Sequence, residues 1–133
     1  MSDKKPLLSI SLLSCGRAKT IRKCLDSLVP LMKKIDSELI IVDTGCSAEI
    51  KAMMSEYTDK IIPFTWCDDF SAARNVGMDA AKGEWFLYID DDEWFIDTKE
   101  IEDFFLSGEY KNYVYACYVQ RNYTVKSKDL YTD

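Results

Sequence analysis

The chain has 133 residues, of which 47% are hydrophobic and 30% are charged. This composition is typical of one globular domain with a hydrophobic core, and it excludes extended disorder. The formal net charge of −6 argues against nucleic-acid binding, because affinity for a phosphate backbone depends on an excess of Lys and Arg.

Five cysteines and no histidine limit the chemistry that the chain can support. The cysteine count is odd and no CxxC pair occurs, so reduced thiols are favoured over a disulfide framework or a zinc site. Without histidine, a metal site would have to use oxygen ligands. No apolar run reaches the roughly 20 residues of a membrane span, and residues 1–10 do not form a signal peptide. We therefore expect no transmembrane segment and a cytoplasmic location, with the inner face of the membrane as the alternative.

The first part of the chain predicts two strands joined by a helix. Residues 7–14 and 38–43 are short apolar runs rich in strand-forming residues. Between them, apolar residues recur at helical spacing over 21–32, and we expect Pro30 to kink this helix. Such a unit joins two buried parallel strands.

The helix and strand pattern then repeats twice. Ser47 is expected to cap a second helix, which precedes a short strand over 60–64. Ser71 is expected to cap a third helix, whose small residues allow close packing and which ends at a left-handed Gly83. Residues 84–89 form the clearest predicted strand.

The last segment predicts one more helix and one more strand. Asp97 and Glu100 have the spacing of a capping box before a helix, and residues 113–120 are expected to form a late strand. Strands that alternate with helices indicate an α/β fold, with a mostly parallel sheet covered by helices on both faces. We expect residues 1–133 to form a single domain.

Polar side chains follow each predicted strand. They are 14–17 after the first strand, Asp43 at the end of the second, Asp68 and Asp69 after the third, and 90–92 after the fourth. Parallel sheets of this kind bind ligands at the carboxyl ends of their strands, so we expect these residues to converge at one edge.

Four consecutive acids, 90–93, follow the strand 84–89 directly. Two carboxylates about 5 Å apart repel each other by roughly 3 kcal/mol at an effective dielectric constant near 20, so a bound cation is the simplest explanation. Mg²⁺ and Mn²⁺ prefer carboxylate oxygens, and Mg²⁺ takes one or two of them together with water and substrate phosphates. The alternative is a solvated turn, which the large aromatic residues at 85, 86, 94 and 95 disfavour.

Other metal-binding and phosphate-binding motifs fail on spacing. A calcium-binding EF-hand loop would need glycine where Phe95 or Ile96 stands, depending on its first residue. Neither the P-loop motif nor the GxGxxG motif occurs, and Gly16 is the only glycine directly after the first strand.

Three blocks of sequence resemble the family 2 glycosyltransferases, which have the GT-A fold. They are SISLLSCGRAKTIRKCLDSL, SELIIVDTGCS and WCDDFSAARNVGMDAAKGEWFLYIDDDEWF. The resemblance implies a GT-A (Rossmann-like) fold with its core at 7–95. It implies transfer of a sugar from a nucleotide diphosphate, expected to be a UDP-sugar, to a saccharide, lipid or protein hydroxyl. It further implies inversion at the sugar and a Mn²⁺ or Mg²⁺ cofactor.

The resemblance also assigns the site residues. Those expected to bind the nucleotide sugar are Ser14, Cys15, Gly16, Arg17, Asp43, Asp69, Arg74, Asp90 and Asp91. In the D-x-D motif of the family, Asp92 binds the metal together with Asp90, which also faces the ribose, and Asp91 takes the variable middle place. Asp43 is expected to hydrogen-bond the base.

The general base of the family lies beyond the D-x-D strand, in an acceptor-binding half. Residues 96–133 are too few for that half, so we expect a chain truncated before it, with 96–133 as its start and the base outside. Two alternatives stay open. One is a nucleotide-binding and metal-binding module without transfer activity. The other is a signalling receiver domain, although such a domain needs acids where Ser14, Cys15 and Gly16 stand.

Overall fold

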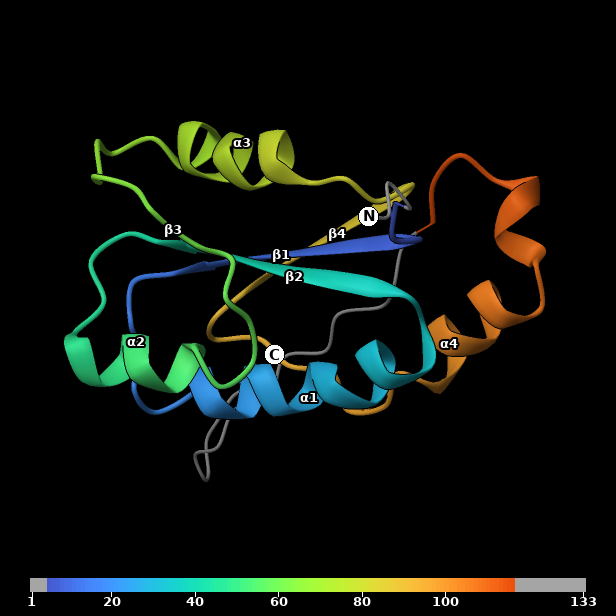
Figure 1. Cartoon of the computed structure of the whole chain (residues 1–133), viewed down its shortest axis with the longest axis horizontal. Helices are drawn as coiled ribbons and strands as arrows, with labels where there is room; N and C mark the ends of the chain where they lie inside the picture. Colours follow the sequence, from blue (N-terminus) through green and yellow to red (C-terminus); the bar gives the residue numbers. More distant parts are fainter. Residues whose placement is uncertain (1–4, 117–133) are drawn as a thin grey trace, which may run out of the picture.

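The computed structural model describes residues 5–116, which form a parallel four-stranded sheet with the order β3-β2-β1-β4. The elements are β1 (Leu8–Ser14), α1 (Ile21–Lys34), β2 (Ser37–Asp43), α2 (Ala48–Met54), β3 (Ile61–Pro63), α3 (Phe70–Ala80), β4 (Trp85–Asp90), α4 (Lys99–Leu106) and the 3-10 helix η1 (Glu109–Asn112). Helix α3 covers one face of the sheet, and α1, α2 and α4 lie on the other face (Figure 1). The expected α/β fold is confirmed.

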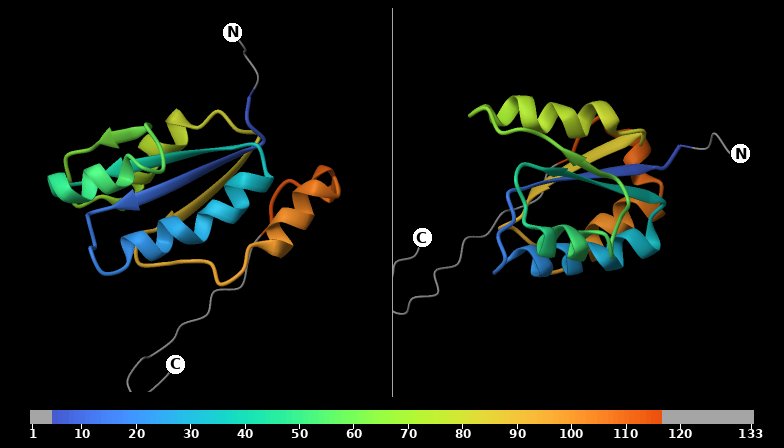
Figure 2. Two further views of the ribbon diagram at one scale, coloured as in Figure 1. Left: turned by 60° about the horizontal axis from the view of Figure 1, so that its bottom comes forward. Right: turned by 60° about the vertical axis from the view of Figure 1, so that its left-hand side comes forward.

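The core lies between the sheet and α1. Leu8, Ile10 and Leu12 alternate along β1 with their side chains buried, as period-2 alternation in a strand requires. They pack with residues at helical spacing on α1, which are Ile21, Cys24, Leu25, Leu28 and Leu31. The right-hand view of Figure 2 shows this layer below the sheet and α3 above it. Pro30 lies within α1 and does not end it.

The strand register brings the polar strand ends to one edge. Ser14 pairs with Asp43 across β1 and β2, and Leu13 pairs with Asp90 across β1 and β4. Asp90 is the last residue of β4, so the acidic segment begins inside the sheet. The expected convergence of the first, second and fourth strand ends is therefore confirmed.

Helix α3 packs on β1 and β2 through small residues, as expected. A Cβ atom on Gly77 would lie 2.1 Å from Oγ of Ser11, which shows how closely the two backbones approach. The expected cap at Ser71 is wrong, because the extended residue Asp69 accepts the backbone N–H of Ala72 at 3.1 Å and α3 begins at Phe70.

The expected left-handed conformation of Gly83 is also wrong. Helix α3 ends at Ala80, its C-cap residue Ala81 has extended backbone, and the positive φ angles of described glycines belong to Gly16, Gly45 and Gly108. Gly83 is instead needed for space, since a Cβ atom there would lie 2.6 Å from the backbone nitrogen of Ser9.

Of the caps expected for α2 and α4, one is confirmed and the other is wrong. Ser47 accepts the N–H of Ile50 at 3.2 Å, which confirms the cap of α2. The capping box expected for α4 is wrong, because Thr98 is the N-cap residue and its hydroxyl donates to the buried Glu102 instead.

The late strand expected over 113–120 is not formed in the part of it that the structure describes. Residues 113–116 are not in a strand, and 117–120 lie outside the described residues. None of the helices within residues 5–116 is long and apolar enough to cross a membrane.

Candidate functional site

The loop after β1 is held by its own residues and by the acidic segment. Ser14 accepts the N–H of Gly16 at 3.0 Å and donates its hydroxyl to Oδ2 of Asp91 at 2.8 Å. Gly16 has φ of 89° and passes close to the loop after β2, where a Cβ atom would lie 3.3 Å from Cα of Cys46. Cys15, which lies between Ser14 and Gly16, is exposed.

The consecutive acids point to different partners. Both carboxylate oxygens of Asp90 accept from Nη2 of Arg74, at 3.2 and 3.1 Å. Asp91 is only 3% exposed and accepts from Nε of Arg17 at 2.9 Å, whereas the neighbouring Asp92 is exposed. Two arginines therefore offset part of the repulsion between the acids, a role that the sequence analysis had given to a cation alone.

The groups around Arg17 shift the pKa of its side chain. The pKa of its guanidinium is raised above the ordinary value, first by the nearby Cys15 and then by Asp91 and Asp92. Arg17 therefore stays fully charged beside the acidic segment.

Arg74 is fixed in place by aromatic rings as well as by Asp90. Its guanidinium carbon lies 4.8 Å from the ring centre of Tyr88 and 5.7 Å from that of Phe70, within the range of cation–π contacts. Among the described residues, Nε of Arg74 is the one buried side-chain nitrogen or oxygen without a hydrogen-bond partner. Since buried polar atoms nearly always have a partner, this N–H is an unsatisfied donor beside the end of β4.

Asp43 is buried at the end of β2. Its Oδ1 accepts the N–H groups of Gly45 and Cys46 at 2.9 and 2.7 Å, and its Oδ2 lies 3.4 Å from Nζ of Lys51. Burial alone would raise the pKa of this carboxyl, but the two amide N–H groups and Lys51 outweigh it and the pKa lies below the ordinary value. Asp43 therefore stays ionised at neutral pH, with Oδ2 as its less engaged oxygen.

Helix α1 and its N-cap residue Thr20 contact the acidic segment that follows β4. The hydroxyl of Thr20 donates to the carbonyl of Asp91 at 2.8 Å, and Ser27 accepts the N–H of Phe95 at 3.1 Å. Nζ of Lys23 lies 4.5 Å from the ring centre of Trp94. The sequence analysis did not identify these residues, and no local pattern marks them because each contact joins residues far apart in the chain.

The structure groups seven of the ten residues predicted for the site into three sets, and the exposed Cys15 and Asp92 belong to none of them. The first contains Ser14, Gly16, Arg17 and Asp91, and the second contains Arg74 and Asp90. Asp43 forms the third with Lys51, which the sequence analysis missed, and stands opposite Ser14 in the sheet. The carboxylate of Asp69 caps α3, where its oxygen is engaged by Ala72. The roles expected for these residues remain predictions.

The residues at the end of β4 limit the kind of metal site that could form there. Within residues 5–116, no group of three or more His, Cys, Asp or Glu side chains is gathered to hold a metal ion. A closed site built from the protein alone is therefore not supported. Asp90 and Asp92 supply two carboxylates, which fits Mg²⁺ or Mn²⁺ completed by water and phosphate oxygens.

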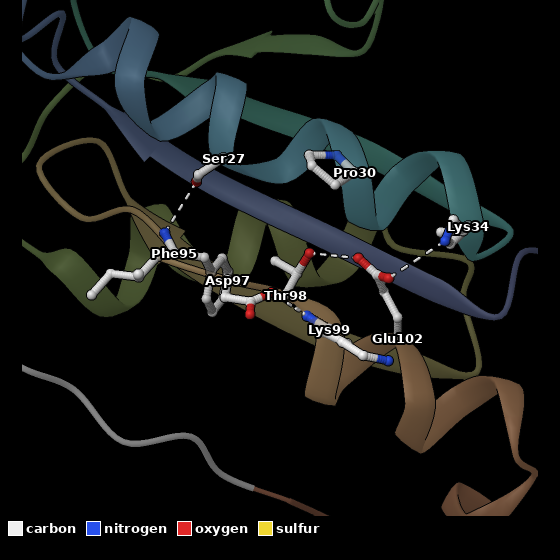
Figure 3. Close-up of a pocket in the computed structure, with 9 residues that line it drawn as sticks. Ser27, Pro30, Lys34, Phe95, Asp97, Thr98, Lys99 and Glu102 are labelled. Atoms are coloured by element: carbon white, nitrogen blue, oxygen red, sulfur yellow. Dashed lines mark hydrogen bonds and ion pairs between the residues drawn. The ribbon is translucent and has the colours of Figure 1, made fainter.

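A cavity of about 360 Å³ lies away from these residues, between α1 and the segment that leads into α4 (Figure 3). Inside it, Glu102 accepts from Thr98 at 2.7 Å and lies 3.9 Å from Nζ of Lys34. These groups satisfy one another, and none of the residues predicted for the site lines the cavity.

The comparison with protein families agrees with the family that the sequence resembles. The family model described as Glycosyl transferase family 2 matches residues 9–132. Because the match extends over most of the chain, the protein belongs to glycosyl transferase family 2.

Several curated proteins are similar over part of their length. A TPR repeat-containing protein of Synechococcus elongatus is 37% identical over 86 residues, which are 65% of this chain and 20% of that protein. The glycosyltransferase GlyA of Streptococcus pneumoniae is 33% identical over 56% of this chain and 11% of its own length. The prophage-derived glycosyltransferase SunS of Bacillus subtilis is 29% identical over 65% of this chain and 20% of its own length. The chain thus spans about a fifth or less of these relatives.

The crystal structure of S. aureus TarS, residues 1–349, has a similar fold. The TM-score is 0.63 at 22% sequence identity, and the match covers 79% of this chain and 32% of that chain. The GT-A fold expected from the sequence is therefore confirmed.

Proposed function

We propose that the chain is the donor-binding part of a glycosyltransferase that moves a sugar from a nucleotide diphosphate, expected to be a UDP-sugar, to an acceptor hydroxyl. The observation that carries the proposal is the placement of Arg74. Its guanidinium is fixed beside Asp90 at the end of β4, and its buried Nε has no partner among the described residues. Family membership and the named glycosyltransferases among the relatives support the same class of reaction.

The donor diphosphate would lie over the end of β4. Arg74 would bind a phosphate oxygen through its free N–H, and the rings of Phe70 and Tyr88 keep the guanidinium from turning away. Asp92, with Asp90, would hold Mn²⁺ or Mg²⁺. When bound, this ion neutralises the charge that develops on the leaving nucleoside diphosphate.

The nucleoside would lie over β1 and β2. Oδ1 of Asp43 is engaged by two backbone N–H groups, so a hydrogen bond to the base would use Oδ2, and Lys51 would stay beside it. The loop 14–17 would form the wall of this part of the site. The reaction would be an in-line displacement with inversion, in which a base outside the described residues takes the proton of the acceptor hydroxyl.

Calorimetric titration with UDP, in the presence of Mn²⁺ and again with EDTA, tests the donor site. We expect binding that depends on the metal ion and that is unchanged in Asp103→Asn, which alters an exposed acid on α4. No binding of UDP under any metal condition would contradict the proposal. An assay of UDP-sugar hydrolysis and transfer then separates an enzyme from the alternative, a module that binds UDP and metal without turnover.

A further inference from the structure

Asp91 occupies the middle of the D-x-D motif, yet its side chain is not directed to solvent at the candidate site. It is 3% exposed, and both of its carboxylate oxygens accept hydrogen bonds from the loop after β1. Oδ2 accepts from the hydroxyl of Ser14 at 2.8 Å and from the backbone N–H of Arg17 at 3.3 Å. Oδ1 accepts from Nε of Arg17 at 2.9 Å. Little of this carboxylate is left for a ligand.

These contacts join two segments that are far apart in the sequence. Leu13 pairs with Asp90, so Asp91 lies just beyond the sheet and level with Ser14. The backbone carbonyl of Asp91 also accepts the hydroxyl of Thr20, where α1 begins. One residue therefore connects the last residue of β1, the loop after it and the start of α1.

We propose that Asp91 is a positioning residue that fastens the loop 14–17 to the acidic segment, so that both parts of the donor site form one rigid frame. Without it, each segment would have to be ordered separately when the donor binds, and the lost conformational freedom would weaken binding. The consequence for donor binding rests on the function proposed above, whereas the fastening itself does not.

The chain offers a matched control near the amino end of β2, at the other end of the strands. Glu38 is also a buried acid, 8% exposed, and it accepts from the hydroxyl of Ser9, the N–H of Lys82 and Nζ of Lys60. Replacing it with glutamine removes a comparable buried charge far from the strand ends at which the donor would bind. Glu38→Gln therefore measures what loss of stability alone does.

Hydrogen exchange of the whole chain, without any ligand, tests the fastening. We expect Asp91→Asn to speed amide exchange about tenfold in both 14–20 and 90–95, while Glu38→Gln leaves both segments unchanged. Ser14→Ala removes one of the contacts and should speed exchange in the same two segments. Unchanged exchange in Asp91→Asn, or faster exchange in one segment only, would overturn the proposal.

Titration with UDP and Mn²⁺ tests the consequence for binding. We expect the affinity to fall about tenfold in Asp91→Asn and to stay the same in Glu38→Gln. In the double variant Ser14→Ala/Asp91→Asn, the loss should be smaller than the product of the two single losses, since both remove the same connection. If the loss of affinity in the double variant equals the product of the two single losses, Asp91 contacts the ligand directly and the positioning role is overturned. If the unaltered chain binds no UDP, the proposed function fails, and the exchange rates alone decide whether Asp91 fastens the two segments.

Discussion

Arg74 and Asp90 face each other across the boundary between α3 and the end of β4. Nη2 of the arginine lies 3.2 and 3.1 Å from the two carboxylate oxygens, and each side chain is about one-third exposed. Helix α3 can bring the guanidinium to this point because Gly77 and Ala73 let the helix lie close to the sheet. The small residues of α3 therefore place a charged group at the candidate site.

Arg74→Met is expected to weaken UDP binding in the presence of Mn²⁺ about tenfold or more, since the variant loses a charged hydrogen-bond donor to phosphate. The melting temperature should change little, because a partly exposed ion pair contributes at most about 1 kcal/mol. Calorimetry and thermal unfolding measure the two effects. The control is Arg22→Met, an exposed arginine on α1 that pairs with Glu56. Equal UDP affinity in both variants would remove Arg74 from the site.

Stability should fall at acid pH because of two buried carboxyls. For Glu38, burial raises the pKa, but the hydrogen bonds from Lys60, Ser9 and Lys82 outweigh it, so that the pKa lies below the ordinary 4.5. The pKa of Asp43 likewise lies below the ordinary 3.8. Groups of this kind stabilise the fold above their unfolded pKa, and the contribution is lost as the pH falls through the folded pKa.

We therefore expect the free energy of unfolding to decrease steeply below about pH 4.5, the upper of the two unfolded values. Urea unfolding between pH 3 and 7 measures it. Glu38→Gln and Asp43→Asn should be less stable at pH 7 and show a shallower decrease, whereas Asp103→Asn should follow the unaltered chain. A decrease of the same slope in all of them would contradict the assignment.

The cysteines should differ widely in reactivity. Burial is the main cause that raises the pKa of Cys24 and of Cys46 to about 12 each, so only about one in ten thousand of these thiols is ionised at pH 8. Cys15 and Cys67 are exposed. A thiol reagent at pH 8, followed by peptide mass spectrometry, should modify Cys15 and Cys67 before Cys24 and Cys46.

Ligand protection of Cys15 extends this test to the candidate site. If the loop 14–17 borders the nucleotide, UDP with Mn²⁺ should slow the modification of Cys15 and leave the slow reaction of Cys24 as it is. Equal rates for Cys15 with and without UDP, under conditions in which UDP binds, would place the nucleotide away from this loop.

Two glycines should respond differently to alanine. Gly77→Ala is expected to destabilise the protein by about 1–3 kcal/mol, because the added Cβ would meet the side chain of Ser11 at 2.1 Å. Ser11→Ala in the same chain should restore part of the loss. Gly83→Ala should be destabilising without rescue by Ser9→Ala, because its Cβ would lie 2.6 Å from the backbone nitrogen of Ser9. Chemical unfolding measures each variant, and full rescue at Gly83 would contradict this geometry.

Much of the fold follows from local patterns. The sequences that became β1, β2 and β4 are short and mainly apolar, and α1 shows clear helical spacing. The edge of the sheet that carries the polar residues follows from parallel strand direction alone. The first residues of the helices were harder to predict. Asp69 and Ser71 compete as the cap of α3, and Asp97 and Thr98 compete as the cap of α4, so tertiary packing decides between them.

The partners within the site could not be predicted from the sequence. Asp90 and Asp91 are adjacent, yet one pairs with Arg74 and the other with Arg17, which lies 74 positions away. Adjacent residues at a strand end point in different directions, and which partner each meets depends on the neighbouring strand and helix. The sequence therefore marked the acids as a site but did not show which arginine each of them meets.

The central claim is that the end of β4 holds a divalent ion against the diphosphate of a sugar nucleotide. The most direct test is anomalous scattering from a crystal of the chain grown with UDP and Mn²⁺. The account predicts a manganese peak beside the carboxylate of Asp92, with the phosphates of UDP between that ion and Arg74. Manganese bound elsewhere, or UDP bound away from Asp90 and Asp92, would contradict it.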